Sequence, residues 1–261
     1  MHEIYQSNNR KFSLNVTITC SGKKTFRVWA EDYGKKFSKY ADRTIIVDGS
    51  RVIYLSFPVS PKQLFIGCLN ATSPTDKDYK VTIEEKPLKD YNIALDSEPL
   101  DFLSLCIPFC QMAGFKIPSP TGTVYKTSDD KFRIKYFPVI KDYATGNVIS
   151  TPARIGHQTG IIEVAYSKFK NYTIPMRIDI LLHEFSHKYK NPKIGLEISN
   201  EIGADINALY IYLGLGFSKI DAICVFGNVF LKAQSSGNQE RMRKIMDYIN
   251  KFENQEFAKL N

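Results

Sequence analysis

The sequence predicts an α+β protein, with a β-rich module over residues 1–95 and a domain of helices and a small mixed sheet over residues 96–261. Three observations support this. Short runs of β-branched and aromatic residues fill the first hundred positions, with turn signals at roughly ten-residue spacing. Helical patterns then alternate with a few short strands. With 261 residues, 43% of them hydrophobic and 24% charged, the chain can bury a sizeable core.

The β-rich module contains six predicted strands, and their number and spacing suggest a small β-sandwich or barrel. These strands cover residues 12–20, 24–32, 43–47, 51–59, 63–69 and 79–85. Asp48-Gly49 predicts a tight hairpin between two of them, because glycine readily adopts the positive φ that such a turn needs. The module carries no pattern typical of catalysis, so we expect a binding or docking role for it.

The second part begins with a predicted buried helix at about 100–114. Strands are predicted at 122–127, 131–140 and 159–169. A helix should then start at Pro175, since proline suits the first turn, and stop at Asn191-Pro192. Further helices are predicted at 196–213, at 218–233, where Ser218 and Asp221 resemble a capping box, and at 238–257.

The charge pattern points to an ordinary solvated surface. The net charge is +8, from 35 basic and 27 acidic residues, and the basic residues are spread along the chain without an arginine-rich arm. A weak affinity for nucleic acid or for an acidic protein partner is the alternative reading of this surplus.

The cysteines and the apolar stretches of the sequence indicate in which cellular compartment the protein is expected. The five cysteines form an odd set without a C-x-x-C pair, which favours buried thiols in a reducing compartment over a disulfide framework. Cys106 and Cys110 lie four residues apart on the first predicted helix, where core packing is a simpler interpretation than metal binding. The N-terminus lacks the apolar run of a secretory signal, and no apolar stretch is long enough for a bilayer. We therefore expect no membrane partner and a cytoplasmic location.

The most informative motif is "LLHEFSHKYKNP" at residues 181–192, which contains H-E-x-x-H. On a helix, residues four apart share a face, so His183 and His187 can bind one ion. Glu184 lies beside them, where it can contact a bound water. The alternative is a polar helix face with two surface histidines. Five apolar residues on the same helix argue against it, because they should bury the imidazoles: Ile178, Ile180, Leu181, Leu182 and Phe185.

A zinc ion needs a third protein ligand, and "SNEIGADINALYIY" offers two candidates. Glu201 and Asp205 are four residues apart on one face of the next predicted helix. One carboxylate can bind the metal while the other orients a ligand histidine. The spacing by itself leaves open which of them does which.

Residues 159–213 resemble the zincin metallopeptidases of the glutamate-zincin group, through "HEFSH" and "NEIGADI". The resemblance implies that His183, His187 and Glu201 bind Zn²⁺. It implies Glu184 as the general base of a zinc-dependent peptidase and Asp205 as the partner that orients His183. It further implies that "GIIEVAY", at 160–166, is the edge strand along which a peptide or protein substrate aligns.

Two features depart from that group. Only residues 188–200 separate His187 from Glu201, a short link that keeps Asp205 open as the third ligand. The group also uses a tyrosine or histidine to stabilise the oxyanion that develops during hydrolysis. The sequence does not assign this residue, and the candidates are His157, Tyr166, Tyr189 and Tyr210.

The whole layout also resembles, more loosely, virion proteins of crAss-like bacteriophages encoded near the portal and tail. That resemblance rests on a β-rich module joined to "LLHEFSH" and "NEIGADINALYIYLGLGFSKIDA". It implies a structural subunit of a homo-oligomeric portal, neck or tail ring that retains a zincin fold and contacts other virion proteins. The chain would then be virion-associated, and zinc would stabilise its fold.

Overall fold

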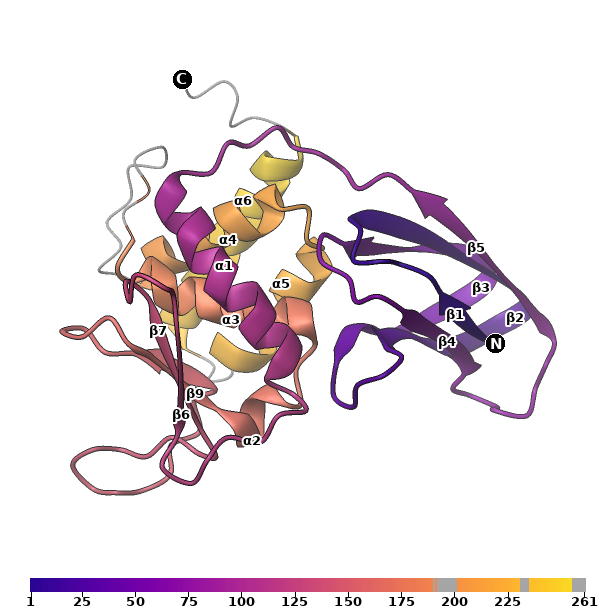
Figure 1. The fold of residues 1–261 in the computed structure, drawn as a ribbon. Coiled ribbons are helices and arrows are strands. Elements are labelled where there is room, and N and C mark those ends of the chain that lie inside the picture. The colour runs from indigo at the N-terminus through magenta and orange to yellow at the C-terminus, as the bar shows by residue number, and fades with distance from the viewer. Residues whose placement is uncertain (190, 192–200, 231–234, 255–261) are drawn as a thin grey trace. The chain divides into compact units, whose positions relative to one another are not determined.

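The computed structural model describes residues 1–189, 191, 201–230 and 235–254 (Figure 1). It confirms the α+β class, with one large antiparallel sheet, a smaller mixed sheet and several helices. The chain forms two compact units. Residues 1–90 with 173–175 make the first, and residues 91–172 with 176–261 make the second. The sequence placed the boundary between its two parts at residue 95.

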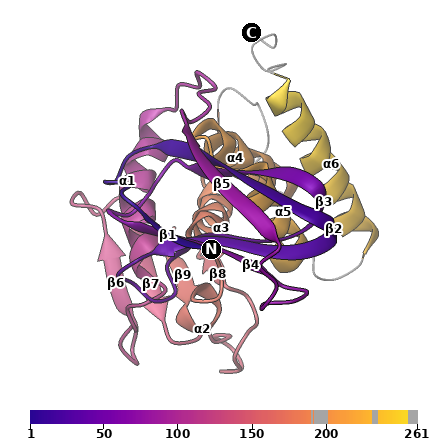
Figure 2. The same ribbon diagram turned by 90° about the vertical axis from the view of Figure 1, so that its right-hand side faces the viewer.

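The first unit is built on a five-stranded antiparallel sheet (Figure 2). Its strands are β1 (His2–Tyr5), β2 (Phe12–Asp32), β3 (Lys39–Phe57), β4 (Leu64–Asn70) and β5 (Tyr79–Lys86). The order is β1-β4-β2-β3, and β5 also pairs with β2. Strand β2 pairs with β3 along nearly its whole length, while β5 pairs with its first half and β4 with its second.

The prediction of a hairpin turn at Asp48-Gly49 is wrong. Strand β3 runs straight through these residues, and β2 likewise runs through Ser21 and Gly22. The pairing shifts register here, since Cys20 pairs with Gly49 and the next pair joins Lys23 to Asp48. Gly22 and Gly49 both have positive φ, at 68° and 77°. The glycines therefore form a bulge that lets two long strands replace four predicted short ones within one antiparallel sheet, where the sequence suggested six short strands in a small β-sandwich or barrel.

The second unit combines a four-stranded mixed sheet with helices. The strands are β6 (Thr123–Lys126), β7 (Arg133–Phe137), β8 (Ala153–Ile155) and β9 (Ile162–Ala165), in the order β6-β7-β9-β8. Strands β7 and β9 are parallel, and the other pairs are antiparallel. The helical elements are α1 (Ser97–Met112), α2 (Tyr166–Phe169), α3 (Ile174–Ser186), α4 (Glu201–Gly214), α5 (Lys219–Val225), the π-helix η1 (Phe226–Phe230) and α6 (Ser236–Glu253).

Several element ends differ from the sequence prediction. The strand predicted to reach residue 169 stops at Ala165, and the next four residues form α2. Helix α3 ends at Ser186, ahead of the predicted stop at Asn191-Pro192. The predicted helical residues 196–200, 231–233 and 255–257 lie outside the described part of the chain.

The position of the edge strand also differs. The sequence resemblance made residues 160–166 an edge strand, but β9 has a neighbour on each side, β7 and β8. Within the described residues, β8 pairs only with β9 and forms that edge of the sheet. This prediction was therefore wrong by one strand.

A buried arginine fixes α3 against α1 and α2. The side chain of Arg177 is fully buried and donates hydrogen bonds to the carbonyl oxygens of Phe169 and Cys110, each at 2.9 Å. These carbonyls belong to the ends of two helices, where intrahelical partners are missing. Cys106 and Cys110 are fully buried in α1, and all five cysteines are free thiols. None of the helices in the described residues has the length and apolar character needed to cross a membrane.

The first unit offers a test of its packing at Gly67, which pairs with Trp29 across the sheet. A Cβ atom at Gly67 would lie 2.2 Å from the indole ring. We expect Gly67→Ala to displace the ring and to lower the free energy of unfolding by about 1–3 kcal/mol. Trp29 is the only tryptophan, so its fluorescence reports both effects. The control is Gly34→Ala, whose Cβ would have its nearest contact at 3.7 Å; equal effects from both variants would contradict this packing.

Candidate metal centre

The H-E-x-x-H residues lie at the end of a buried helix. The five apolar residues that predicted burial of α3 are all buried, and His183 is 3% exposed. His187 follows the helix in a tightened turn, where its N–H bonds the carbonyl oxygen of Glu184 at 3.3 Å. The apolar stripe thus turns the two imidazoles towards the interior of the second unit.

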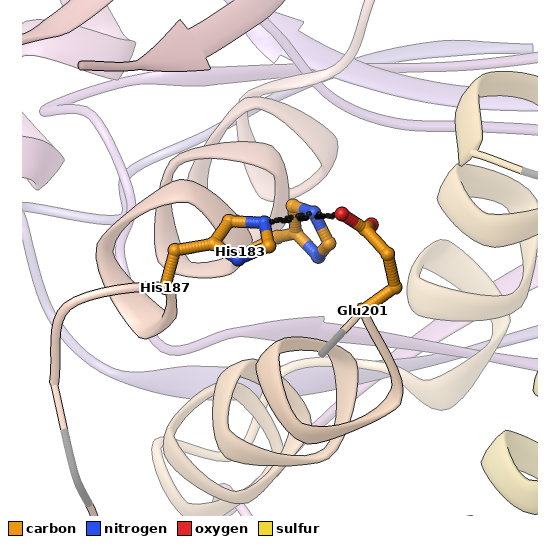
Figure 3. Close-up of side chains that lie close together, drawn as sticks. All are labelled: His183, His187 and Glu201. Atoms are coloured by element: carbon orange, nitrogen blue, oxygen red, sulfur yellow. Dashed lines mark hydrogen bonds and ion pairs between the residues drawn. The ribbon is translucent and has the colours of Figure 1, made fainter. Parts of the chain in front are cut away.

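Three ligand atoms converge at this point (Figure 3). The Nε2 atoms of His183 and His187 are 3.2 Å apart. Carboxylate oxygens of Glu201 lie 3.5 Å from the first and 3.6 Å from the second. The oxygen near His183 is Oε2 of Glu201 and the one near His187 is Oε1. One ligand atom from each residue lies within 4.8 Å of the other two, so the three residues form a possible metal-binding triad.

Asp205 contacts the other nitrogen of His183. Its Oδ1 lies 2.9 Å from Nδ1, and its side chain is fully buried. Glu201 is the first residue of α4, one helical turn earlier, and its side chain is 55% exposed. Asp205 thus faces away from the triad, where it orients the imidazole, and Glu201 faces the triad. This geometry favours Glu201 over Asp205 as the third ligand.

Arg241 of α6 is a part of the centre that the sequence did not indicate. Its guanidinium donates two hydrogen bonds to Asp205, at 2.8 and 2.9 Å, and lies 3.3 Å from Glu201. Only 12% of this side chain is exposed. The sequence gives no sign of this role of Arg241, because no local pattern connects α6 to α4.

Burial and the surrounding charges shift the pKa values of His183 and His187 in opposite directions. Burial alone lowers the pKa of His183, but the hydrogen bond and the charge of Asp205 outweigh it, with help from Glu184 and Glu201, so the net shift is upward. The pKa of His187 is lowered by burial and by the neighbouring His183. His183 is thus the imidazole that accepts a proton first when no metal competes for it.

The side chain of Glu184 is largely shielded from solvent. The residue is 8% exposed, and burial raises the pKa of its carboxyl group. The charge of His183 and a hydrogen bond from the backbone of Ile155 partly offset this rise. Ile155 is the last residue of β8, so the hydrogen bond to the Glu184 carboxylate comes from the edge strand and not from α3. A raised pKa makes Glu184 a better proton acceptor near neutral pH.

Asp179 is a further buried acid, one turn before His183 on α3. The residue is fully buried, and neither carboxylate oxygen has a hydrogen-bond partner among the described residues. Burial raises its pKa to about 8, the charge of His183 lowers it, and the charges of Asp205 and Asp221 raise it further. The folded chain therefore holds this carboxyl group protonated at neutral pH.

The four candidates for an oxyanion-stabilising residue are placed differently. Tyr189 donates a hydrogen bond to Asp96 at 2.7 Å, and the ring of Tyr166 packs against Tyr136. Tyr210 is half-buried on α4, one turn beyond Asp205. The ring of His157 lies beside that of His187, with 6.5 Å between centroids. Of the four, His157 is the one with a recorded ring contact to the triad.

A cavity of about 240 Å³ lies beside the end of β8 and the end of α3, and among the described residues its lining includes neither the triad nor Glu184. Its lining includes Phe185 and Lys188, which flank the histidine motif, and Ile155, which contacts Glu184. Phe102 and Phe132 supply aromatic walls from α1 and from the residue before β7.

Replacing Arg241 tests the charge balance of the centre. We expect Arg241→Met to lower the free energy of unfolding of the second unit by about 3–5 kcal/mol, because Asp205 loses the cation that neutralises it in the interior. Urea unfolding followed by helical circular dichroism measures this. The matched control is Arg243→Met on the same helix; its guanidinium is 62% exposed, and we expect a change below about 1 kcal/mol. Similar losses in both variants would contradict the role of Arg241.

Asp179 predicts a pH dependence of stability. Its pKa is about 8 in the folded chain and about 4 when unfolded, so the folded state binds the proton more tightly. Its contribution to stability is therefore complete below about pH 4 and is lost as the pH rises to 8. In metal-free protein, Asp179→Asn should raise the melting temperature by several degrees at pH 9 and little at pH 4. The exposed Asp247→Asn serves as control, and parallel pH profiles for wild type and Asp179→Asn would contradict the assignment.

Comparison of the chain with known protein families, curated proteins and solved structures gives no match. The geometry of this centre and the chemistry of its residues therefore indicate what the chain can do.

Proposed function

We propose that this chain is a zinc-dependent peptidase whose centre is formed by His183, His187 and Glu201. The observation that carries the proposal is the convergence of two imidazoles and one carboxylate, with one ligand atom from each within 4.8 Å of the others, beside a buried glutamate. Two imidazoles and one carboxylate are a donor set typical of catalytic zinc, because they leave one position for water or substrate. Zinc bound there supplies a Lewis acid that polarises a carbonyl oxygen and acidifies water.

Glu184 is the proton carrier in this proposal. Its carboxylate takes a proton from the attacking water and passes it to the nitrogen of the leaving amine. Burial raises its pKa, and the backbone of Ile155 holds it in place, so the group is both basic enough and oriented. Asp205 lies 2.9 Å from Nδ1 of His183 and so keeps Nε2 directed towards the triad.

Strand β8 is the proposed binding edge for an extended substrate. The backbone N–H of Gly156 and the carbonyl of Pro152 bond residues on the β9 side, at 3.0 and 2.9 Å. The backbone N–H and C=O groups of successive residues in a strand point to opposite sides. Those of Ala153 and Ile155 therefore point away from β9, towards the free edge. Ile155 meets Glu184 there. A peptide added along β8 would thus pass directly by the general base.

The cavity beside the end of β8 suits a substrate side chain. Phe102 and Phe185 stack with 4.4 Å between centroids, and Phe132 meets both edge-on, so one wall is aromatic. Lys131 and Lys188 contribute charge at its rim. A bulky apolar side chain can bury its surface against this wall.

Glutamate 184 tests the proposal most directly. We expect Glu184→Gln to bind one zinc per chain, as wild type does, and to cleave a peptide library at least about 100-fold more slowly, because the proton acceptor is lost. Metal content is read by elemental mass spectrometry and cleavage by peptide sequencing. Adding a chelator to wild type should abolish cleavage, and adding zinc should restore it.

The control for this experiment is Glu240→Gln on α6, whose side chain is 58% exposed and outside the centre. It should cleave at the wild-type rate. Zinc-loaded wild type that cleaves no peptide in the library, with a melting temperature that depends on zinc, would contradict the peptidase proposal and indicate a structural metal.

A further inference from the structure

His157 lies in the short loop that joins β8 to β9. The loop is compact, because the N–H of Gly156 bonds the carbonyl of Ile161 at 3.0 Å and the N–H of Gly160 bonds the carbonyl of Gly156 at 2.8 Å. Gly160 has a φ of 67°, a conformation that favours glycine and lets the chain reverse. His157 is exposed near the start of this reversal.

Two contacts hold the start of the loop against the end of α3. The backbone of Ile155 bonds the carboxylate of Glu184, and the carbonyl of His157 accepts a hydrogen bond from Nζ of Lys188. The chain therefore follows the helix over the same stretch that contains His187. These anchors place the backbone of His157 beside the triad independently of where its own ring points.

The ring of His157 is close enough to join the triad after a small movement. Its centroid is 6.5 Å from that of His187, while the centroids of His183 and His187 are 4.8 Å apart. Two imidazoles that share one zinc have centroids roughly 5–6 Å apart, given bonds of about 2.1 Å. The distance between the rings of His157 and His187 thus exceeds this range by about 1 Å, and the exposed ring of His157 would have to move towards the triad to bind the same ion. Its imidazole has no recorded hydrogen bond within the described part of the chain that would have to break.

We infer that His157 is a third imidazole ligand, which occupies the position that His183, His187 and Glu201 leave open. This inference rests on the zinc centre of the proposed function and does not require peptidase activity. Four protein ligands would close the centre in its resting state. Hydrolysis would then require His157 to leave the metal, which would free the position for water or substrate.

X-ray absorption at the zinc edge tests this inference, because it counts the imidazoles around the metal. We expect three in wild type and two in His157→Ala. The control is Gln158→Ala, the next residue of the same exposed loop, which should keep three. Zinc affinity, measured by competition with a chelating dye, should fall at least about tenfold in His157→Ala and stay unchanged in the control.

A small hydroxamate gives a second readout, since it needs the open position. It should bind zinc-loaded His157→Ala more tightly than wild type. Two imidazoles in wild type, or the same count in wild type and His157→Ala, would overturn the role of His157 while leaving the triad intact. Wild type that binds no zinc would overturn the triad and this inference together. Absence of cleavage in a protein with three imidazoles would contradict only the peptidase proposal.

Discussion

The centre depends on the charge balance around Asp205, a carboxylate that is completely buried. An isolated ion in such a place is costly, and it is tolerated because Arg241 forms two hydrogen bonds with it and His183 meets it from the other side. The same contacts fix the orientation of His183. A single ionic group thus stabilises the packing of α4 and α6 and also determines which nitrogen of His183 faces the triad.

Burial around this group has a second effect: it gives the neighbouring acids Asp179, Glu184 and Asp205 different protonation behaviour and different contacts. Asp205 is paired with a cation, Asp179 lacks a partner among the described residues and stays protonated, and Glu184 is held by a backbone N–H at the edge of the sheet. In the proposed peptidase, their different partners would give them different tasks: an orienting acceptor, a neutral core group and a proton carrier. Sequence composition treats all three simply as acidic residues.

The edge strand connects the sheet to this chemistry. Strand β8 has only three residues, yet it contacts Glu184 through Ile155 and leads straight into the loop of His157. Three residues are enough to fix β8 in place, because the strand pairs with β9 on one side and contacts α3 on the other. Substrate alignment, orientation of the base and access to the metal position would all be controlled by the same few residues.

The sequence by itself determined the features that arise from local periodicity. The four-residue spacing of His183 and His187 places both on one helix face wherever that helix lies, and the apolar residues of the same helix favour their burial. The α+β class follows from the same kind of local pattern. Only the tertiary structure decided that Asp205 faces the far nitrogen of His183, that Arg241 neutralises it, and that β8 rather than β9 is the edge. It also decided that glycines at a bulge extend β2 and β3. These outcomes depend on contacts between segments far apart in the chain, and neither spacing nor composition encodes which distant segments will meet.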